Sequence, residues 1–303
     1  MQARFAAAPA RPRRRGRPSQ RSGDQTADVP ALERGLTVLE AIARSRTGLG
    51  YGELSALGIP SASLVRILRT LHRRGFLRQP PGTSRYRLGL RLHALGTAAL
   101  ASLEVVQEAT PVLPRLAAET GETAELVLLD GDELTWAATA DAPGGARLAG
   151  QAATGLRTER LHSTAPGKLF LALVGRALCG AVAPGSPVPP GSLLERYLRD
   201  HGLQRFTPHT LTSPQRLQEA LDTIRGRGYS VDREEYRVGL WRCAAPVYAA
   251  GGALTAALGI AGPTARHSPE RESAIAGACL AAAGVVTRAL GGTVSEPAST
   301  SGF

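Results

Sequence analysis

Arginine is the residue type whose spacing in this sequence points most directly to a binding chemistry. Arg66, Arg69 and Arg73 recur at intervals of three and four residues, which places their side chains on one face of a helix. A guanidinium group is permanently charged and can donate paired hydrogen bonds to phosphate oxygens or to the edge of a guanine. The spacing therefore predicts a helix that contacts nucleic acid.

The residues around these arginines predict the elements that hold the helix in place. A first helix over 31–44 has an apolar face formed by Leu32, Leu36, Leu39 and Ala43. A shorter helix over 51–58 ends at Gly58, because glycine readily adopts the positive φ that turns the chain. The arginine-bearing helix begins near Pro60, a residue suited to a first helical turn. Its buried stripe is formed by Leu64, Ile67, Leu68 and Leu71.

A basic hairpin is predicted after Gly75. The stretch FLRQPPGTSRYRLG alternates around a Pro-Pro-Gly-Thr-Ser turn, which is typical of two short antiparallel strands. Three helices and a hairpin are typical of a winged helix-turn-helix, whose third helix enters the major groove. The residues expected to contact DNA are Ser61, Ser63, Arg66, Arg69, Arg73, Arg78, Arg85 and Arg87. A small helical protein-interaction domain with solvated arginines is the alternative.

The first residues carry a separate basic motif. The segment Arg15-Gly16-Arg17-Pro18 is similar to an AT-hook, in which an extended chain lies in a narrow A·T minor groove with an arginine on either side. Arg15 and Arg17 would then contact DNA as well. A flexible basic tail is the alternative interpretation.

The net charge of +11 is concentrated in the first third of the sequence. Residues 1–30 contain seven arginines and two aspartates, a charge of +5, and residues 31–93 contain eleven arginines and three glutamates, a charge of +8. The 18 basic and 20 acidic residues of 94–303 give that part a charge of −2. A basic domain joined to a nearly neutral one is typical of a nucleic-acid reader with a second, non-binding module.

Motifs for common enzyme chemistry are missing from the sequence. It contains no GxSxG, no HExxH and no GxGxxG after a strand. The stretch APGKLF is no phosphate loop, because His162 and Leu169 stand where glycine and Ser/Thr are needed. The three cysteines are widely spaced, and no apolar run could span a membrane or form a secretory signal. We therefore expect a cytoplasmic protein without catalytic residues, metal or cofactor.

The remaining sequence predicts an α+β domain. A helix over 105–118 would bury Ala109, Val112, Leu113 and Leu116. Strands are predicted at 123–129, 133–139, 241–248 and 253–261, and helices at 213–226 and 268–288. A mixed or antiparallel sheet flanked by helices is the simplest arrangement. The expected domains are a disordered arm (1–29), a winged helix-turn-helix (30–91), a linker helix (92–104), the α+β domain (105–290) and a disordered tail (291–303).

Several ordered motifs resemble those of the IclR family of bacterial transcriptional regulators. ALERGLTVLEAIA and GIPSASLVRILRTLHRRGFL resemble its DNA-binding half, while LHSTAPGKLFLAL and CAAPVYAAGGALTAALGIAGPTAR resemble blocks of its effector-binding domain. The resemblance covers about residues 31–290 and implies a GAF-like fold that binds a small-molecule effector and mediates oligomerisation. It implies a double-stranded DNA operator as a partner. It also implies a homodimer or tetramer associated through the linker helix, whose apolar face is Leu92, Leu95 and Ala99.

The resemblance also implies where the effector binds. The lining would include His162, Ala165, Pro166, Asp232, Leu240, Arg242, Gly259 and Ala261. Arg242 stands where a cysteine is common in the family, and Gly259 and Ala261 stand where polar residues are frequent. A guanidinium suits a carboxylate and the small residues open volume, so we expect an organic acid bulkier than glyoxylate. A salt bridge from Arg242 to Asp232 or a neighbouring glutamate is the alternative.

Two other classes of function stay open at this point. One is an enzyme with an appended DNA-binding domain, and the other is an architectural DNA-binding protein without ligand control.

The sequence does not predict the operator. Ala62 stands where the family commonly has a residue that can hydrogen-bond DNA, so the operator sequence of relatives does not carry over.

Overall fold

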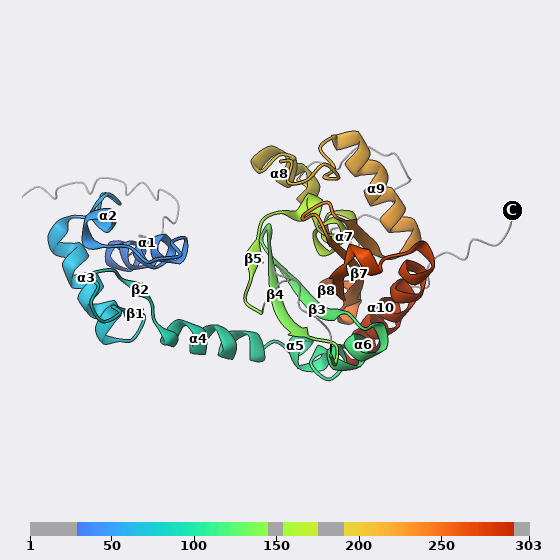
Figure 1. Cartoon of the computed structure of the whole chain (residues 1–303), viewed down its shortest axis with the longest axis horizontal. Helices are drawn as coiled ribbons and strands as arrows, with labels where there is room; N and C mark the ends of the chain where they lie inside the picture. Colours follow the sequence, from blue (N-terminus) through green and yellow to red (C-terminus); the bar gives the residue numbers. More distant parts are fainter. Residues whose placement is uncertain (1–28, 145–153, 175–190, 294–303) are drawn as a thin grey trace, which may run out of the picture. The chain divides into compact units, whose positions relative to one another are not determined.

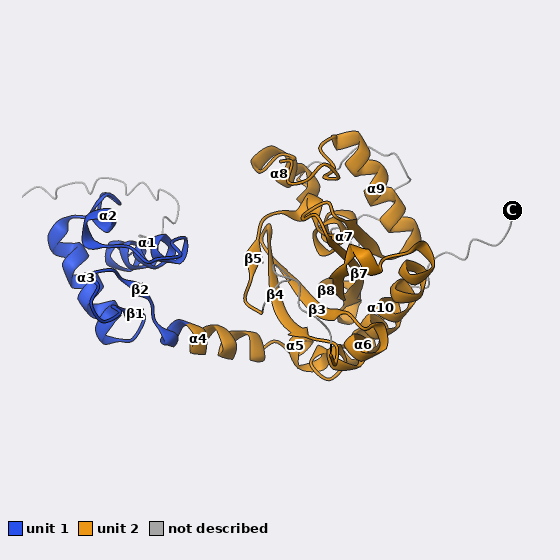
Figure 2. Ribbon diagram, viewed as in Figure 1, with its two compact units in different colours: residues 1–92 blue, residues 93–303 orange. Residues whose placement is uncertain are grey.

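The computed structural model describes residues 29–144, 154–174 and 191–293 (Figure 1). The proposed arm with Arg15 and Arg17 lies outside these residues, as does the C-terminal tail from residue 294. The chain divides into two compact units, residues 1–92 and 93–303 (Figure 2). Each unit is described by itself.

The first unit is the winged helix-turn-helix that the sequence predicts. Its helices and strands are α1 (Pro30–Ala43), α2 (Tyr51–Ser55), α3 (Ser61–Arg73), β1 (Leu77–Arg78) and β2 (Arg87–Leu88). Gly58 and Gly75, which follow α2 and α3, have φ angles of +72° and +76°, a conformation that glycine adopts without strain. The antiparallel strands pair Leu77 with Leu88 and Arg78 with Arg87.

Of the four residues predicted to form the apolar face of α1, Leu39 alone packs against the core of the first unit. Val38 and Ile42, one helical turn apart, are 0% and 2% exposed and join the core of the unit. Leu32 and Leu36 are 61% and 46% exposed. The stripe that packs against α3 thus lies on the C-terminal half of α1, rotated from the face that the leucine spacing suggests, because burial depends on which turn meets a neighbouring helix.

The linker helix α4 (Leu90–Ala101) begins and ends a few residues earlier than predicted, and the boundary between the two units falls within it. None of its residues is buried within this chain. Leu90 is 81% exposed and Leu95 is 48% exposed.

The second unit is an α+β domain built on one antiparallel sheet. Its helices are α5 (Glu104–Ala109), α6 (Leu113–Thr120), α7 (Ala165–Leu173), α8 (Leu193–Asp200), α9 (Pro214–Arg227) and α10 (Pro269–Ala289), with short 3-10 turns η1 (Leu161–Ser163), η3 (Ala250–Gly252) and η4 (Thr264–Arg266). Its strands are β3 (Thr123–Asp130), β4 (Glu133–Ala140), β5 (Arg157–Thr158), β6 (Ser230–Arg233), β7 (Leu240–Tyr248) and β8 (Leu254–Pro263). Their order is β5-β4-β3-β8-β7-β6, and each pairing among the described residues is antiparallel.

The single helix predicted over 105–118 is wrong, because α5 and α6 are separate helices. Pro111 lies in the break between them; proline has no backbone N–H to donate, and its ring clashes with the preceding turn of a continuous helix. Ala109, Leu113 and Leu116 are nevertheless buried, as the apolar spacing predicts.

Helices cover both faces of the sheet (Figure 1). On one face α5, α6 and α10 pack on the side chains of Leu126, Trp241, Cys243 and Leu258. On the other, α7, α8 and α9 pack on Val127, Trp136, Ala244 and Ala257. The strand residues alternate between these faces, so Arg242 lies on the same face as Ala244, beneath α7.

Candidate effector pocket and DNA-binding surface

Helix α3 presents a basic face to solvent. Leu64 and Leu68 are 0% and 2% exposed and fix the helix against the core of the first unit. Ile67 and Leu71 pack beside them, so the predicted buried stripe is confirmed. The residues of the basic face are exposed, namely Ser61, Arg66, Arg69 and Arg73, whereas Ser63 is half-buried.

The arginines of the hairpin differ from those of α3, because they bond to the protein itself. The Arg85 guanidinium donates to the Gly48 carbonyl oxygen, from Nε at 3.1 Å and Nη2 at 2.8 Å, and forms an ion pair with Glu53 at 2.9 Å. Arg87 Nε donates to the Thr47 carbonyl oxygen at 3.2 Å. A backbone N–H bond from Gly50 and the bond from Arg85 lower the pKa of Glu53.

Arg78 Nε donates to the carbonyl oxygen of Leu88 in the partner strand at 3.3 Å. The three hairpin arginines thus hold the hairpin together and attach it to the segment before α2. DNA contact through Arg78, Arg85 and Arg87 stays a prediction, and it would use the donors that these bonds leave over.

Strand register gathers most of the predicted effector residues on one sheet face. Asp232 pairs with Arg242, and Arg242 pairs with Ala261. Gly259 pairs with Ala244 on one side and with Glu125 on the other. Side chains directly opposite in neighbouring strands point to the same face, so residues far apart in the sequence meet here.

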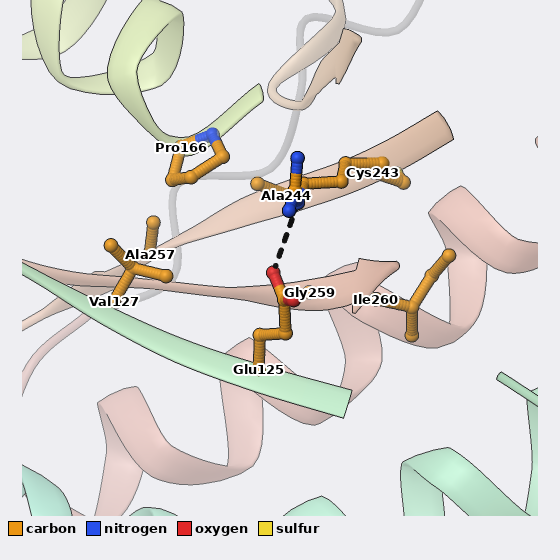
Figure 3. A pocket seen from close by; sticks show the side chains of 9 residues that line it. Glu125, Val127, Pro166, Cys243, Ala244, Ala257, Gly259 and Ile260 are labelled. Atoms are coloured by element: carbon orange, nitrogen blue, oxygen red, sulfur yellow. Dashed lines mark ion pairs between the residues drawn. The ribbon is translucent and has the colours of Figure 1, made fainter. Parts of the chain in front are cut away.

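Arg242 is the centre of this group. It is 1% exposed, its Nε lies 3.4 Å from Glu125 Oε2, and its Nη1 lies 3.7 Å from Asp232 Oδ2. The first of these ion pairs is drawn as a dashed line in Figure 3. Its Cζ lies 5.8 Å from the centre of the Trp136 ring. The salt bridge considered as the alternative for Arg242 is therefore present, to two acids rather than one.

These ion pairs leave hydrogen-bonding capacity unused. Within the described part of the chain, neither Nε nor Nη1 of Arg242 has a hydrogen-bond partner, nor has Oε1 of Glu125 or Oδ2 of Asp232. Buried polar atoms in folded proteins are normally hydrogen-bonded, so such a cluster calls for an explanation. A bound molecule with hydrogen-bond donors or acceptors would supply the partners that these buried atoms lack.

Burial changes the acidity of both carboxyl groups. Burial raises the pKa of Asp232 to about 7, although the Arg242 charge opposes this shift. Burial also raises the pKa of Glu125, again opposed by Arg242. Next to them, Lys168 of α7 forms a buried ion pair with Glu235, whose backbone N–H donates to Asp232 Oδ1 at 2.7 Å.

A narrow pocket lies between α7 and the sheet (Figure 3). Its lining residues are Glu125, Val127, Pro166, Arg242, Cys243, Ala244, Ala257, Gly259 and Ile260. These residues leave no enclosed space for even one water molecule, whereas typical ligand pockets enclose roughly 300–1,000 Å³. A ligand of the size of a small aromatic acid would therefore have to displace side chains as it binds.

Local sequence explains how α7 begins and why it packs closely on η1. Thr164 caps the helix, its Oγ1 accepting from the Gly167 N–H at 3.2 Å. A side chain on Gly167 would place Cβ 2.3 Å from the Leu161 carbonyl oxygen. Glycine thus lets α7 pack directly on η1, and Pro166 at the start of the helix faces the pocket (Figure 3).

The predicted effector residues fall into three groups. Pro166, Arg242 and Gly259 line the pocket. Asp232, Leu240 and Ala261 are buried around it, and Ala165 is buried beside Pro166. His162 does not line it; its ring nitrogens lie 2.5 Å from Tyr197 Oη and 2.9 Å from the Gln204 carbonyl oxygen. Burial lowers the pKa of His162.

Gly259 has a backbone reason to be glycine. A Cβ at this position would lie 1.9 Å from the carbonyl oxygen of Cys243 in the neighbouring strand. Strands β7 and β8 can approach this closely only if residue 259 has no side chain.

Sequence reasoning missed six of the lining residues, namely Glu125, Val127, Cys243, Ala244, Ala257 and Ile260. It also missed Trp136, which together with Glu125 lies beside the Arg242 guanidinium. Glu125 and Trp136 are buried, at 3% and 1% exposure. One signal was available for Glu125, since it is an acid in the middle of the apolar strand sequence TAELVLL. Charged residues are almost never fully buried unless they are paired, so a buried cationic partner could have been expected.

The comparisons with known proteins decide the family. The IclR helix-turn-helix domain model matches residues 31–81, and the model for the C-terminal region of the bacterial transcriptional regulator IclR matches residues 97–185 and 187–288. The chain belongs to the IclR family. The HTH-type transcriptional regulator BhcR of Paracoccus denitrificans is 34% identical over 89% of this chain and 92% of its own.

Solved structures of IclR proteins share the fold. An IclR regulator from Alicyclobacillus acidocaldarius is 28% identical, with a TM-score of 0.70 over 86% of this chain and 98% of that one. An IclR homologue from Microbacterium hydrocarbonoxydans, in complex with 4-hydroxybenzoate, is 22% identical, with a TM-score of 0.66 over 86% and 99%. The family consists of DNA-binding regulators rather than enzymes, so this protein is a DNA-binding transcriptional regulator with an effector-binding domain.

Two further observations concern other kinds of site. In the described ranges, no helix is long and apolar enough to cross a membrane. The same residues contain no group of three His, Cys, Asp or Glu side chains that could hold a metal ion.

Proposed function

We infer that this regulator changes its affinity for DNA when a small carboxylic acid binds at Arg242. The observation that carries this proposal is the buried guanidinium, two of whose nitrogens have no hydrogen-bond partner in the described part of the chain. A guanidinium in a largely closed site donates two parallel hydrogen bonds to a carboxylate. The N-terminus of α7, with Pro166 in the pocket wall, adds a partial positive charge on the same side.

Glu125 and Asp232 do not prevent an acid from binding. Their pKa values are raised by burial, to about 7 for Asp232. One of them can therefore take up a proton as the ligand carboxylate arrives, and the ligand then replaces a protein carboxylate beside Arg242. We expect acid binding to strengthen as the pH falls through about 7.

The acid would be larger than glyoxylate. Gly259 and Ala261, the neighbours of Arg242 on β8, carry no bulky or polar side chain, and the Trp136 ring 5.8 Å from the Arg242 Cζ offers an apolar wall. The fold relative that binds 4-hydroxybenzoate supports a carboxylate of this size. The protein would act as a homodimer or tetramer on an operator, associating through the exposed apolar residues of α4, and the acid would alter the placement of the paired DNA-binding domains.

The test is a thermal-shift screen of aromatic and aliphatic acids, 4-hydroxybenzoate included, with the full chain. Each acid that stabilises the wild-type protein is then titrated against Arg242→Met and against Arg233→Met, an arginine on β6 that is outside the pocket lining. We expect Arg242→Met to weaken acid binding more than tenfold, because the variant cannot form the charge-assisted bonds, while DNA binding without acid persists. Equal titrations in both variants would remove Arg242 from the site. Absence of stabilisation by all of these acids would contradict a carboxylate effector, and extension of the same result to other metabolite classes would favour an architectural DNA-binding protein.

A further inference from the structure

A chain of contacts leads from solvent to Arg242. Arg160 is exposed, Tyr236 is half-buried and Arg242 is 1% exposed. Arg160 Nη1 donates to Tyr236 Oη at 3.4 Å, and its Cζ lies 5.5 Å from the centre of the Tyr236 ring. The Cζ of Arg242 lies 5.7 Å from the centre of the same ring. One aromatic ring thus contacts an exposed guanidinium and a buried one.

Phe206 completes this surface. The Cζ of Arg160 lies 4.5 Å above its ring, and the Phe206 and Tyr236 rings meet edge to face at 6.1 Å. Such contacts between a cation and an aromatic face are attractive. Three segments that are distant in the sequence, those preceding η1, following α8 and connecting β6 to β7, therefore contribute one side chain each.

The loop that carries Tyr236 is fixed rather than free to swing. Glu234 has a φ of 61° and is the sole non-glycine residue with positive φ among the described ones, a conformation that persists only where neighbours enforce it. Thr207 Oγ1 donates to the Glu234 carbonyl oxygen and Thr210 Oγ1 to that of Glu235, both at 2.6 Å. Lys168 holds the side chain of Glu235. These bonds hold the two residues that precede Tyr236.

We propose that Tyr236 and Arg160 form the entrance of the effector pocket. The Tyr236 ring is the wall between Arg242 and solvent, and Arg160 is the exposed cation that first attracts an anionic ligand. This proposal rests on the carboxylate site proposed at Arg242. Arg160 at the surface then contributes to the preference for anions together with Arg242 in the interior, because a cation at the mouth of a narrow site concentrates anions there.

Quenching of tryptophan fluorescence tests the entrance without knowledge of the effector. The chain has two tryptophans. Trp136 lies beside Arg242, and Trp241 lies on the opposite sheet face, where its ring contacts His267. Iodide, an anion, and acrylamide, a neutral molecule, serve as quenchers of the full chain. The variants are Tyr236→Ala, Tyr236→Phe and Arg160→Ala. Two further variants serve as controls: Tyr229→Ala removes a ring that lies over the Arg227 guanidinium, and Arg157→Ala removes an exposed arginine three residues before Arg160.

We expect Tyr236→Ala to raise quenching by both molecules several-fold, and iodide quenching more than acrylamide quenching. Tyr236→Phe and the two controls should stay near the wild type. Arg160→Ala should lower the ratio of iodide to acrylamide quenching. The variant Trp136→Phe/Tyr236→Ala should not show the added quenching, and Trp241→Phe/Tyr236→Ala, which keeps Trp136 as the emitter, should retain it.

If tryptophan quenching in Tyr236→Ala equals that of the wild type, Tyr236 does not form the entrance. An unchanged ratio in Arg160→Ala would remove Arg160 from it. If Tyr236→Ala raises acrylamide quenching without favouring iodide, the entrance stands and the anion site at Arg242 is what fails, so the two proposals are separated by the same data.

Discussion

The arginines of α3 and Arg242 of β7 place the same side chain in opposite environments. Arg66, Arg69 and Arg73 are exposed on one helical face, where water solvates the guanidinium groups in the absence of DNA. Arg242 is 1% exposed and lies between two carboxylates. Replacing a surface arginine has little effect on stability, whereas replacing a buried one leaves its acidic partners without a counter-charge and lowers the free energy of unfolding. DNA affinity and fold stability should therefore respond separately to the two kinds of arginine.

The largest expected effect is on DNA binding. Replacing Arg66, Arg69 and Arg73 with alanine should weaken binding to a duplex selected by the full chain roughly a thousandfold, since each bidentate base contact contributes about 1–3 kcal/mol. Fluorescence anisotropy at several salt concentrations measures this change. The slope of log affinity against log salt should fall by about 0.9 for each phosphate that the variant no longer neutralises.

The control for this variant removes the same charge from the other unit. Arg115, Arg216 and Arg288 are exposed on helices α6, α9 and α10 of the second unit, and their replacement by alanine should leave DNA affinity nearly unchanged. An equal reduction of affinity in both triple variants would mean that total charge, rather than the face of α3, determines DNA binding.

The next effect concerns stability. Arg242→Met should lower the free energy of unfolding by about 3–5 kcal/mol, because it leaves two buried acids without their counter-charge. Urea unfolding followed by tryptophan fluorescence reports on the second unit, which contains Trp136 and Trp241. The variant Glu125→Gln/Asp232→Asn/Arg242→Met should recover much of this stability. A destabilisation no larger than that of Arg233→Met would contradict the buried network.

The smallest effect is a dependence of stability on pH. The pKa of Asp232 is raised to about 7 in the folded protein from 3.8, so the folded state binds this proton more strongly than the unfolded state. The contribution of Asp232 to stability is full below about pH 4 and falls as the pH rises towards 7. Asp232→Asn should flatten this part of the profile, measured as urea midpoints between pH 5 and 8.

Another group changes the profile in the opposite direction. Burial lowers the pKa of His162 from its usual value of 6.5. Its contribution to stability is therefore present above about pH 6.5 and is lost as the pH falls below that value. The difference between wild type and Asp232→Asn isolates the aspartate. A wild-type stability that falls relative to that of Asp232→Asn as the pH drops from 8 to 5 would contradict the raised pKa of Asp232.

The two regions also differ in how far sequence could predict them. The α3 face, its basic residues and the strands of the second unit follow from local periodicity, which strand and helix geometry imposes on neighbouring residues. The orientation of α1 and the break at Pro111 depend on which surfaces meet in the folded chain, and there the leucine spacing misled. Resemblance located Arg242, Asp232 and Gly259, but pairing of Arg242 with Glu125 depends on the alignment of β3, β8 and β7.

Selection of bound fragments from a pool of random double-stranded DNA tests the central claim most directly. The full chain, a chain that begins at Asp28 and the α3 triple variant would be compared in the same selection. If α3 reads the operator, the first two proteins enrich the same inverted repeat and the third enriches none. The account is contradicted if the repeat disappears when the first 27 residues are removed but persists when the α3 arginines are replaced.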